Sequence, residues 1–329
     1  MLLRVRDRVE RLCAAATEAT ALRRDVLDAL RRVVGFDAYA FVLTDPETEV
    51  GVQPLAELPV PSDIPKVIRA KYQSTVNRWT GLGPPATLTG PSPWRDLLSR
   101  YGVSDVLSAC FRDQFGCWAF LDLWRRGGTF AAADVESVAS ISAPVTRALR
   151  RCQAATFGSA APARRVDPVV LLLNAELHVV GQTAATAAYL RTLVPPPEGA
   201  APIPASAYNV AAQLLANEAG VDRHPPMGRV HLADGVWLAV RAGRIDQDTI
   251  AVSIEQASPG ERVGIFARAF GFTARETDLL ERLAVGADTR ELARTMHLSE
   301  HTVQDHLKSV FAKTSVRTRR ALLARALGT

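Results

Sequence analysis

Apolar residues recur every three or four positions near the start of the chain, between arginines and acids. This spacing predicts one amphipathic helix over residues 2–34, with Gly35 as its end. A β-branched and aromatic run predicts a strand over 39–43, followed by a turn at Asp45-Pro46. The proline-rich stretch after this turn predicts only short helices, such as one over 64–72.

A hairpin and a long helix close this first region. Two strand-like segments, 106–111 and 117–124, are separated by turn-forming residues, which predicts a β-hairpin. Helical periodicity then covers 131–152. The small-residue segment 158–163 has no periodicity and predicts a linker.

The pattern after the linker predicts a second unit with strands at both ends. Two short strands, 169–173 and 177–180, come first, and a proline triplet at 195–197 lies between two helices, 183–193 and 206–216. Strand-like runs at 229–232, 236–241 and 249–255 then predict a three-stranded antiparallel sheet. Ser258-Pro259-Gly260 marks the entry to a C-terminal region.

The C-terminal region predicts four short helices. The first begins at a capping box formed by Thr273 and Glu276 and ends at Gly286. A helix over 289–296 and a tight turn precede a third helix, which Ser299 caps and which runs to about residue 314. The last helix covers 318–327, and its leucines are Leu322, Leu323 and Leu327, which the sequence cannot divide between the domain core and a dimer contact.

The third of these helices has one apolar and one polar side. Val303, Leu307, Val310 and Phe311 form the stripe that we expect to be buried. The outward positions are Gln304, Asp305, Lys308 and Ala312, with His301 and Thr302 near the first turn. A helix that presents polar side chains in this way fits the major groove, where base edges distinguish all four base pairs.

The charge distribution favours the same end of the chain. The net charge is +5, with 39 basic and 34 acidic residues, and +4 of it lies in the last 69 residues. Arg317, Arg319 and Arg320 lie beside a short turn, where they are well placed to neutralise phosphates. The alternative is a basic helical bundle that contacts another protein.

This region resembles the LuxR-type (also called FixJ/NarL-type) helix-turn-helix domain. The matching positions are Thr273, Arg275-Glu276, Leu280, Gly286, Leu292-Ala293, Leu298-Ser299, Thr302-Val303, His306, Lys313, Val316 and Arg319. The resemblance implies that Ser299 and Thr302 lie near phosphates and that the outward face from Gln304 to Lys308 reads bases. The predicted DNA-binding residues are Ser299, Thr302, Gln304, Asp305, Lys308, Lys313, Arg317, Arg319 and Arg320.

Two positions depart from the family pattern. Gln304 stands where the family usually has lysine, and Thr314-Ser315 replaces the usual Leu-Gly. The first departure changes the expected base contact, because glutamine pairs well with adenine whereas lysine favours guanine. The second leaves the predicted fold unchanged.

The N-terminal regions carry no diagnostic motif. Their element order resembles a GAF domain over 1–155 and a PAS-type domain over 168–257, with linkers at 156–167 and 258–270 and the helix-turn-helix domain at 271–329. We find no phosphoacceptor pattern, no phosphate-binding loop and no nucleophile elbow, so we expect no enzyme activity. Five tryptophans are candidates to line a small-molecule cavity, but aromatic residues in strands usually fill cores, which is the interpretation we favour; they are Trp79, Trp94, Trp118, Trp124 and Trp237. His178, His224 and His231 lack metal-ligand spacing, so we expect surface or core roles for them.

The four cysteines are Cys13, Cys110, Cys117 and Cys152, which are too few and too widely spaced for a disulfide framework. We expect buried thiols, although Cys110 and Cys117 flank the hairpin and leave a redox pair open. No apolar run is long enough to span a bilayer and no signal peptide is recognised, which predicts a cytoplasmic protein without membrane contact.

Together these features predict a multidomain α+β protein. The N-terminal domain is expected to be GAF-like α/β, the central domain PAS-like α+β, and the C-terminal domain an all-α four-helix bundle. The predicted function is sequence-specific binding of double-stranded DNA by a homodimeric transcriptional regulator, with the helix Ser299–Thr314 in the major groove. No cofactor is evident, and a small-molecule effector is left open. The alternative is a signalling sensor or sensor enzyme whose basic C-terminus docks on a protein partner.

Overall fold

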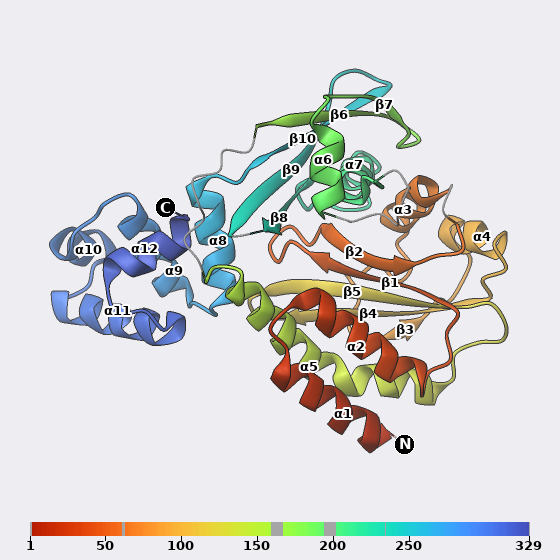
Figure 1. Ribbon diagram of the computed structural model, residues 1–329, viewed down its shortest axis with the longest axis horizontal. Helices are drawn as coiled ribbons and strands as arrows, with labels where there is room; N and C mark the ends of the chain where they lie inside the picture. Colours follow the sequence, from red (N-terminus) through yellow and green to blue (C-terminus); the bar gives the residue numbers. More distant parts are fainter. Residues whose placement is uncertain (1, 61–62, 159–166, 194–201, 234, 329) are drawn as a thin grey trace.

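The computed structural model describes residues 2–60, 63–158, 167–193, 202–233 and 235–328. They form two mixed α+β units, each with an antiparallel sheet, and one unit of helices (Figure 1). In Figure 1 the first unit lies at the lower right, the second above it and the helical unit at the left. The predicted α+β class is confirmed. No helix in the described ranges has the length and apolar character needed to cross a membrane.

The first unit is a five-stranded sheet with helices on both faces. Its strands are β1 (Ala38–Thr44), β2 (Gly51–Glu57), β3 (Ala86–Thr87), β4 (Asp105–Asp113) and β5 (Gly116–Arg125), in the order β2-β1-β5-β4-β3. One face packs on α1 (Leu2–Ala15), α2 (Ala19–Arg31) and α5 (Ala132–Ala155), and the other on α3 (Ile64–Gln73) and α4 (Pro93–Ser99). Side chains that alternate along the strands supply both cores: Phe41 faces α2 and α5, whereas Val42 faces the other side.

The second unit repeats this strand order with different helices. Its strands are β6 (Val169–Asn174), β7 (Val179–Gln182), β8 (Met227–Ala233), β9 (Val236–Arg244) and β10 (Thr249–Gln256), in the order β7-β6-β10-β9-β8. The helices are α6 (Thr186–Leu193) and α7 (Ala205–Glu218). Helix α7 is buried along most of its length because it lies between this sheet and β2 and α3 of the first unit.

The helical unit contains α8 (Pro259–Ala269), α9 (Ala274–Ala284), α10 (Thr289–Met296), α11 (Glu300–Thr314) and α12 (Arg319–Leu327). Each begins at a side-chain cap, from Ser258, Thr273, Asp288, Ser299 and Thr318 respectively. These caps satisfy amide groups that the first turn of a helix leaves without partners. The four helices predicted after residue 271, with the Thr273–Glu276 capping box, are confirmed.

A buried arginine joins all three units. Arg229 of β8 donates through Nε and Nη2 to both carboxylate oxygens of Asp45, at 2.7 and 2.8 Å, and through Nη1 to the Glu261 carbonyl of α8, at 3.2 Å. Asp45 is fully buried, so its charge is matched by this arginine rather than by water. The paired guanidinium fixes the β1–β2 turn, the second sheet and α8 relative to one another.

Several sequence expectations need correction. The helix expected over 2–34 is two helices, because the Glu18 carboxylate accepts from the amides of Thr20 and Ala21, both at 2.7 Å, and starts α2 beside α1. Strand β2 was not expected, because it contains Pro54. It is an edge strand, where proline is tolerated since no outer neighbour needs its amide.

Two further expectations change in the second half of the chain. The sheet expected to have three strands has five, because the pair β6–β7 joins it through β10. The segment 258–270, expected to be a linker, is mostly α8, with Ser258 and Glu261 as its capping box. Most of the linker expected at 156–167, and the proline triplet at 195–197, lie outside the described residues.

Candidate nucleic-acid interface

Helix α11 forms one side of the candidate site. Val303, Leu307 and Val310 are almost fully buried in the domain core, as their spacing predicted, and Thr314 is buried one turn later. Phe311, which we expected in the same buried stripe, is only partly buried against that core. Ser299 starts the helix, since its Oγ accepts from the Thr302 amide at 3.1 Å. The buried stripe therefore fixes which side of α11 faces outward.

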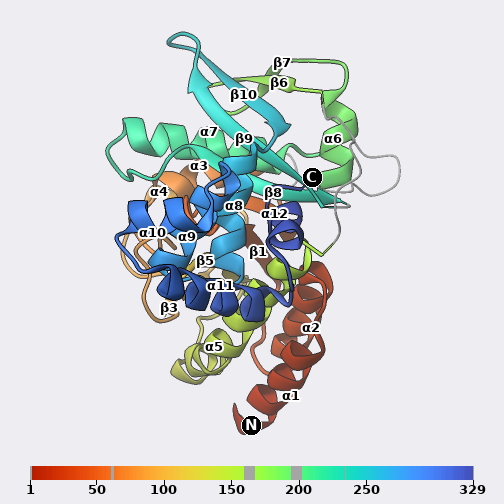
Figure 2. The same ribbon diagram turned by 90° about the vertical axis from the view of Figure 1, so that its left-hand side faces the viewer.

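The outward side of α11 is polar and open. Gln304, Asp305 and Lys308 are exposed, and Figure 2 shows α11 crossing the face of the molecule turned to the viewer. Lys308 Nζ lies 3.0 Å from Asp305 Oδ1, and this hydrogen bond lowers the pKa of Asp305. Both side chains are more than half exposed, so water screens the pair and it holds neither residue firmly.

The first turn of α11 presents two hydroxyl groups. Ser299 is exposed and Thr302 is half-buried, and their hydroxyl oxygens lie 2.9 Å apart. The preceding turn is held by His297, which adopts a left-handed conformation with φ of 54° at the end of α10. A tight turn of this kind leaves the N-terminal end of α11 uncovered, where amide groups favour an anion.

The three predicted arginines differ in their surroundings. Arg319 is half-buried and donates through Nη2 to Thr289 Oγ1 at 2.7 Å, which ties the start of α12 to the start of α10. Arg317 and Arg320 are exposed and have no hydrogen bond or ion pair with any residue that the structure describes. These two guanidinium groups are free to contact an external anion.

Lys313 is exposed, but two hydrogen bonds tie its side chain to the domain. Its Nζ donates to Glu276 Oε2 at 2.6 Å and to the Gly271 carbonyl at 2.9 Å. Burial opposes ionisation of Glu276, but hydrogen bonds from Lys313 and Ser309 prevail and lower its pKa to about 2. The sequence pointed to Lys313 only as a DNA contact. Its partner lies 37 residues away, a separation that no local pattern reveals.

The leucines of α12 are divided between two environments. Leu322 is fully buried in the core, whereas Leu323 and Leu327 are partly buried against it. Helix α12 packs on α8, where Arg262 donates to the carbonyls of Ala326 and Arg325 at 3.4 and 3.3 Å. Much of α12 is therefore covered within the chain.

The five tryptophans are buried packing residues. Trp79 stacks on Phe120 with ring centroids 4.5 Å apart, and its Nε1 donates to the Glu49 carbonyl at 2.8 Å. Trp237 stacks on Phe157 at 5.1 Å. None of the five lines the two cavities described next. Among the histidines, His224 Nδ1 lies 2.6 Å from Asp222 Oδ1, and the described residues contain no group of three or more metal-ligating side chains.

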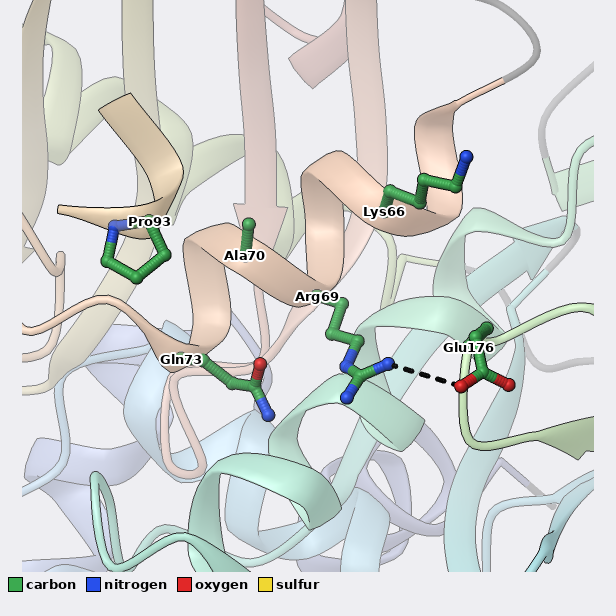
Figure 3. Close-up of a pocket in the computed structure, with 6 residues that line it drawn as sticks. All are labelled: Lys66, Arg69, Ala70, Gln73, Pro93 and Glu176. Carbon is green, nitrogen blue, oxygen red and sulfur yellow. Dashed lines mark ion pairs between the residues drawn. The ribbon is translucent and has the colours of Figure 1, made fainter. Parts of the chain in front are cut away.

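Two cavities lie between the first and second units. One, of about 250 Å³, is lined by α3, Pro93 and the β6–β7 turn (Figure 3). Figure 3 shows Arg69 reaching toward Glu176, 3.9 Å away, while Lys66 points away from that pair. The other, of about 290 Å³, lies between the α1–α2 turn, the end of α5 and β8, and Glu18, Gln53 and Gln153 supply polar groups to it.

Comparison with known proteins identifies the part of the helical unit that follows α8. Residues 271–326 match the family model described as bacterial regulatory proteins, luxR family. The chain is 43% identical over 47 residues to the CsgBAC operon transcriptional regulatory protein of Escherichia coli and to the probable csgAB operon transcriptional regulatory protein of Salmonella typhimurium, which covers 14% of this chain and 22% of each relative.

A third relative extends the match slightly. The probable HTH-type transcriptional regulator GfsR of Streptomyces halstedii is 36% identical over 67 residues, which is 20% of this chain and 28% of that protein. The chain thus matches less than a third of the length of these relatives. Each match is also shorter than either one of the two α+β units. Residues 271–326, which run from Gly271 through α9, α10 and α11 to near the end of α12, are a helix-turn-helix domain of the luxR family of bacterial regulatory proteins.

Proposed function

We propose that this protein is a transcription regulator that binds duplex DNA by placing α11 in the major groove. The observation that carries the proposal is the outward face of α11, on which Gln304, Asp305 and Lys308 are exposed while the opposite side is buried in the domain core. The relatives that match this domain are named transcriptional regulators. An α-helix of this kind fits the width of the major groove.

The proposed contacts divide into base reading and phosphate positioning. Gln304 and Lys308 read base edges, with Gln304 suited to adenine and Lys308 to guanine, and Asp305 accepts from cytosine. The hydroxyls of Ser299 and Thr302 and the guanidinium groups of Arg317 and Arg320 contact phosphates. Arg319 adds charge beside them while it holds α10. We assign Lys313 to joining α11 and α9, because Glu276 and Gly271 already occupy its ammonium group.

We further propose that the two α+β units are sensory or dimerisation domains, GAF-like over 1–155 and PAS-like over 168–257. Their shared strand order supports a common architecture for the two. A homodimer would place two copies of α11 on neighbouring half-sites about one helical turn apart. For a small-molecule effector, the cavity beside β8 is the best-supported position, because it adjoins the Arg229 junction with α8. A cytoplasmic, non-enzymatic protein fits this role.

Titration of labelled duplex DNA with the full chain, followed by fluorescence anisotropy at several salt concentrations, tests the proposal. Because phosphate binding releases counterions, we expect the affinity to fall steeply as salt rises, and a selected site should survive excess competitor DNA. Equal binding to every competitor would remove the sequence-reading claim. No salt-dependent binding to any duplex would favour the alternative, a signalling protein whose basic C-terminus docks on a protein partner.

A further inference from the structure

Two cysteine thiols lie in contact across the β4–β5 hairpin. Cys110 Sγ of β4 and Cys117 Sγ of β5 are 3.4 Å apart, and both thiols are free. The register explains this contact: Phe111 pairs with Ala119 and Arg112 with Cys117, so Trp118 is an extra residue in β5. This bulge turns Cys117 to the same face of the sheet as Cys110. In a regular strand, the alternation of side chains would place Cys117 on the opposite face.

The surroundings of the pair favour reaction at sulfur. Cys117 is fully buried, whereas Cys110 is partly exposed and gives solvent a route to the pair. The hydrogen bond from Cys110 lowers the pKa of Cys117, whereas burial and the nearby Glu49 carboxylate raise it and the positive charge of Arg112 lowers it. The same hydrogen bond and burial raise the pKa of Cys110, so Cys117 is the thiol of the pair that ionises more readily. Glu49 holds the Arg112 guanidinium at 2.5 Å, which fixes this charge on the open side of the hairpin. Thiolate is the form of cysteine that oxidants attack.

We propose that Cys110 and Cys117 are a modification site at which a peroxide forms a reversible intrachain disulfide. The thiolate sulfur attacks one peroxide oxygen, the oxygen–oxygen bond breaks, and the other oxygen leaves as water, which gives a sulfenic acid. The second thiol then attacks the sulfur of the sulfenic acid. The hydroxyl group of the sulfenic acid takes the proton of that thiol and leaves as a second water. Two thiols are oxidised by two electrons and one hydrogen peroxide is reduced, so atoms and charge balance.

We expect disulfide formation to shift the hairpin as well as to rotate the two cysteine side chains. A disulfide bond is about 2.05 Å long, so the sulfurs must approach by about 1.4 Å. Gly116 cannot absorb the shift freely, because it lies against Pro46 so closely that an added Cβ would be 2.2 Å from the Pro46 carbonyl oxygen. We therefore expect part of the movement to reach the adjacent turn residue, Phe115.

Phe115 is also the point at which the hairpin touches the helical unit. Its carbonyl accepts from Arg268 Nη1 of α8 at 3.0 Å, and its ring packs against Gly271, between α8 and α9. Gly271 has a φ of +67° and space for no larger residue without a shift of the Phe115 ring, since an added Cβ would lie 3.2 Å from it. Oxidation should therefore loosen or re-aim the connection to the DNA-binding domain. This consequence, unlike the disulfide itself, rests on the proposed function.

Graded hydrogen peroxide, followed by intact-mass measurement and peptide mapping, tests the modification. In a Cys13→Ser/Cys152→Ser background we expect a loss of about 2 Da, a Cys110–Cys117 cross-link and full reversal by dithiothreitol. The matched variant Cys110→Ser/Cys117→Ser retains the two other buried cysteines and should keep both as free thiols. An unchanged mass in the first variant, or a cross-link between chains, would overturn the proposal.

The consequence for the helical unit has its own readouts. Amide hydrogen exchange of the full chain should rise over 259–272 on oxidation of the wild type and stay constant in Cys110→Ser/Cys117→Ser. DNA affinity should change at least threefold in the same comparison. A disulfide without faster exchange or altered affinity would refute the coupling to α8 and leave the modification site intact. Absence of DNA binding in both redox forms would contradict the proposed function instead, since the mass result does not depend on DNA.

Discussion

The C-terminal helices carry positive charges on two sides, and the two sides differ in how those charges are matched. On the side that meets the rest of the molecule, Arg262, Arg268 and Arg325 donate to backbone carbonyls, among them those of Gly235, Phe115 and Phe157. On the side that carries α11, Arg317 and Arg320 have no partner among the described residues, and Lys308 pairs only with an exposed acid.

This difference separates charges that hold the structure from charges that are available to a ligand. An arginine whose donors are satisfied within the chain is already desolvated, and its removal leaves buried acceptors without partners. An exposed arginine keeps its hydration and its counterions, which it can release when it meets a phosphate. Substitutions on the first side should therefore change stability, and substitutions on the second should change DNA affinity.

The largest effect is expected at the buried pair of Arg229 and Asp45. Arg229 is matched within the chain, like the arginines on the first side of the helices, and it lies at the junction of the three units. Arg229→Met should lower the free energy of unfolding by about 3–5 kcal/mol, because it leaves Asp45 as a buried charge without its partner. Urea unfolding followed by circular dichroism measures the loss.

A matched control lies on the next strand. Arg241 of β9 also pairs with carboxylates, those of Glu255 and Glu261, but its side chain is 34% exposed. Arg241→Met should therefore cost less than about 1 kcal/mol. Similar losses in both variants would show that burial does not set the strength of these pairs, and the comparison between the two sides would lose its physical basis.

Lys313 provides the next test, because it lies on α11 yet has partners within the chain. Glu276→Gln should lower stability near neutral pH by about 2 kcal/mol, since it removes the charge that Lys313 and Ser309 stabilise. The pKa of Glu276 is lowered to about 2 in the folded protein. Its contribution is therefore complete above the unfolded pKa, near 4.5, and is lost as the pH falls from there toward 2.

Denaturant titrations from about pH 2 to about pH 7, a range that includes the interval between the two pKa values, should show the wild type and Glu276→Gln converging at low pH. Lys313→Met should be similarly destabilised at neutral pH but should keep the salt dependence of DNA binding. A lower salt dependence would return Lys313 to the residues that contact phosphate.

Local patterns were enough to predict the helices α9 to α12 of the helical unit, whereas α8 was expected to be a linker. The capping box at Thr273, the cap at Ser299 and the stripe of Val303, Leu307 and Val310 all act within a few residues, and the structure has them as expected. Strand β2 was missed because Pro54 opposes strand formation unless the strand lies at an edge, and edge position depends on the whole sheet. The same limit hid the pairing of β6 with β10, which joins two strands predicted from the sequence to the second sheet.

The candidate site also has a part that the sequence predicted and a part that only the folded structure shows. Exposure of Gln304, Asp305 and Lys308 follows from helical periodicity alone, so the sequence predicted the outward face. The partners of Lys313 and Arg319 lie in α9 and α10 or their flanking turns, and only the packed domain brings them together. Likewise, the contact between Cys110 and Cys117 depends on a β-bulge, and no residue type in the hairpin predicts this bulge.

On the α11 side, the largest effect is expected at Lys308. Lys308→Ala should reduce the discrimination between a preferred site and competitor DNA by about 1–3 kcal/mol if its ammonium group contacts a base. Lys66→Ala is the matched control, because Lys66 also pairs with an aspartate three residues earlier, at 2.7 Å, but lies in the first unit. Competition titrations with single-base variants of the site measure the effect, and equal discrimination by both variants would exclude Lys308 from base reading.

The smallest effects are expected at Arg317 and Arg320. Either arginine changed to alanine should weaken binding to all duplexes by a similar factor and lower the slope of log affinity against log salt by about 0.9, the value for one phosphate contact. Arg223→Ala removes an exposed arginine from the second unit and should leave the slope unchanged. Because Arg317 and Arg320 have no partners within the described chain, unfolding free energies should stay within about 0.5 kcal/mol of the wild type. A loss of stability without a change in slope would show that both arginines hold the structure. It would contradict the claim that charges on the α11 side act on DNA affinity while charges on the other side act on stability.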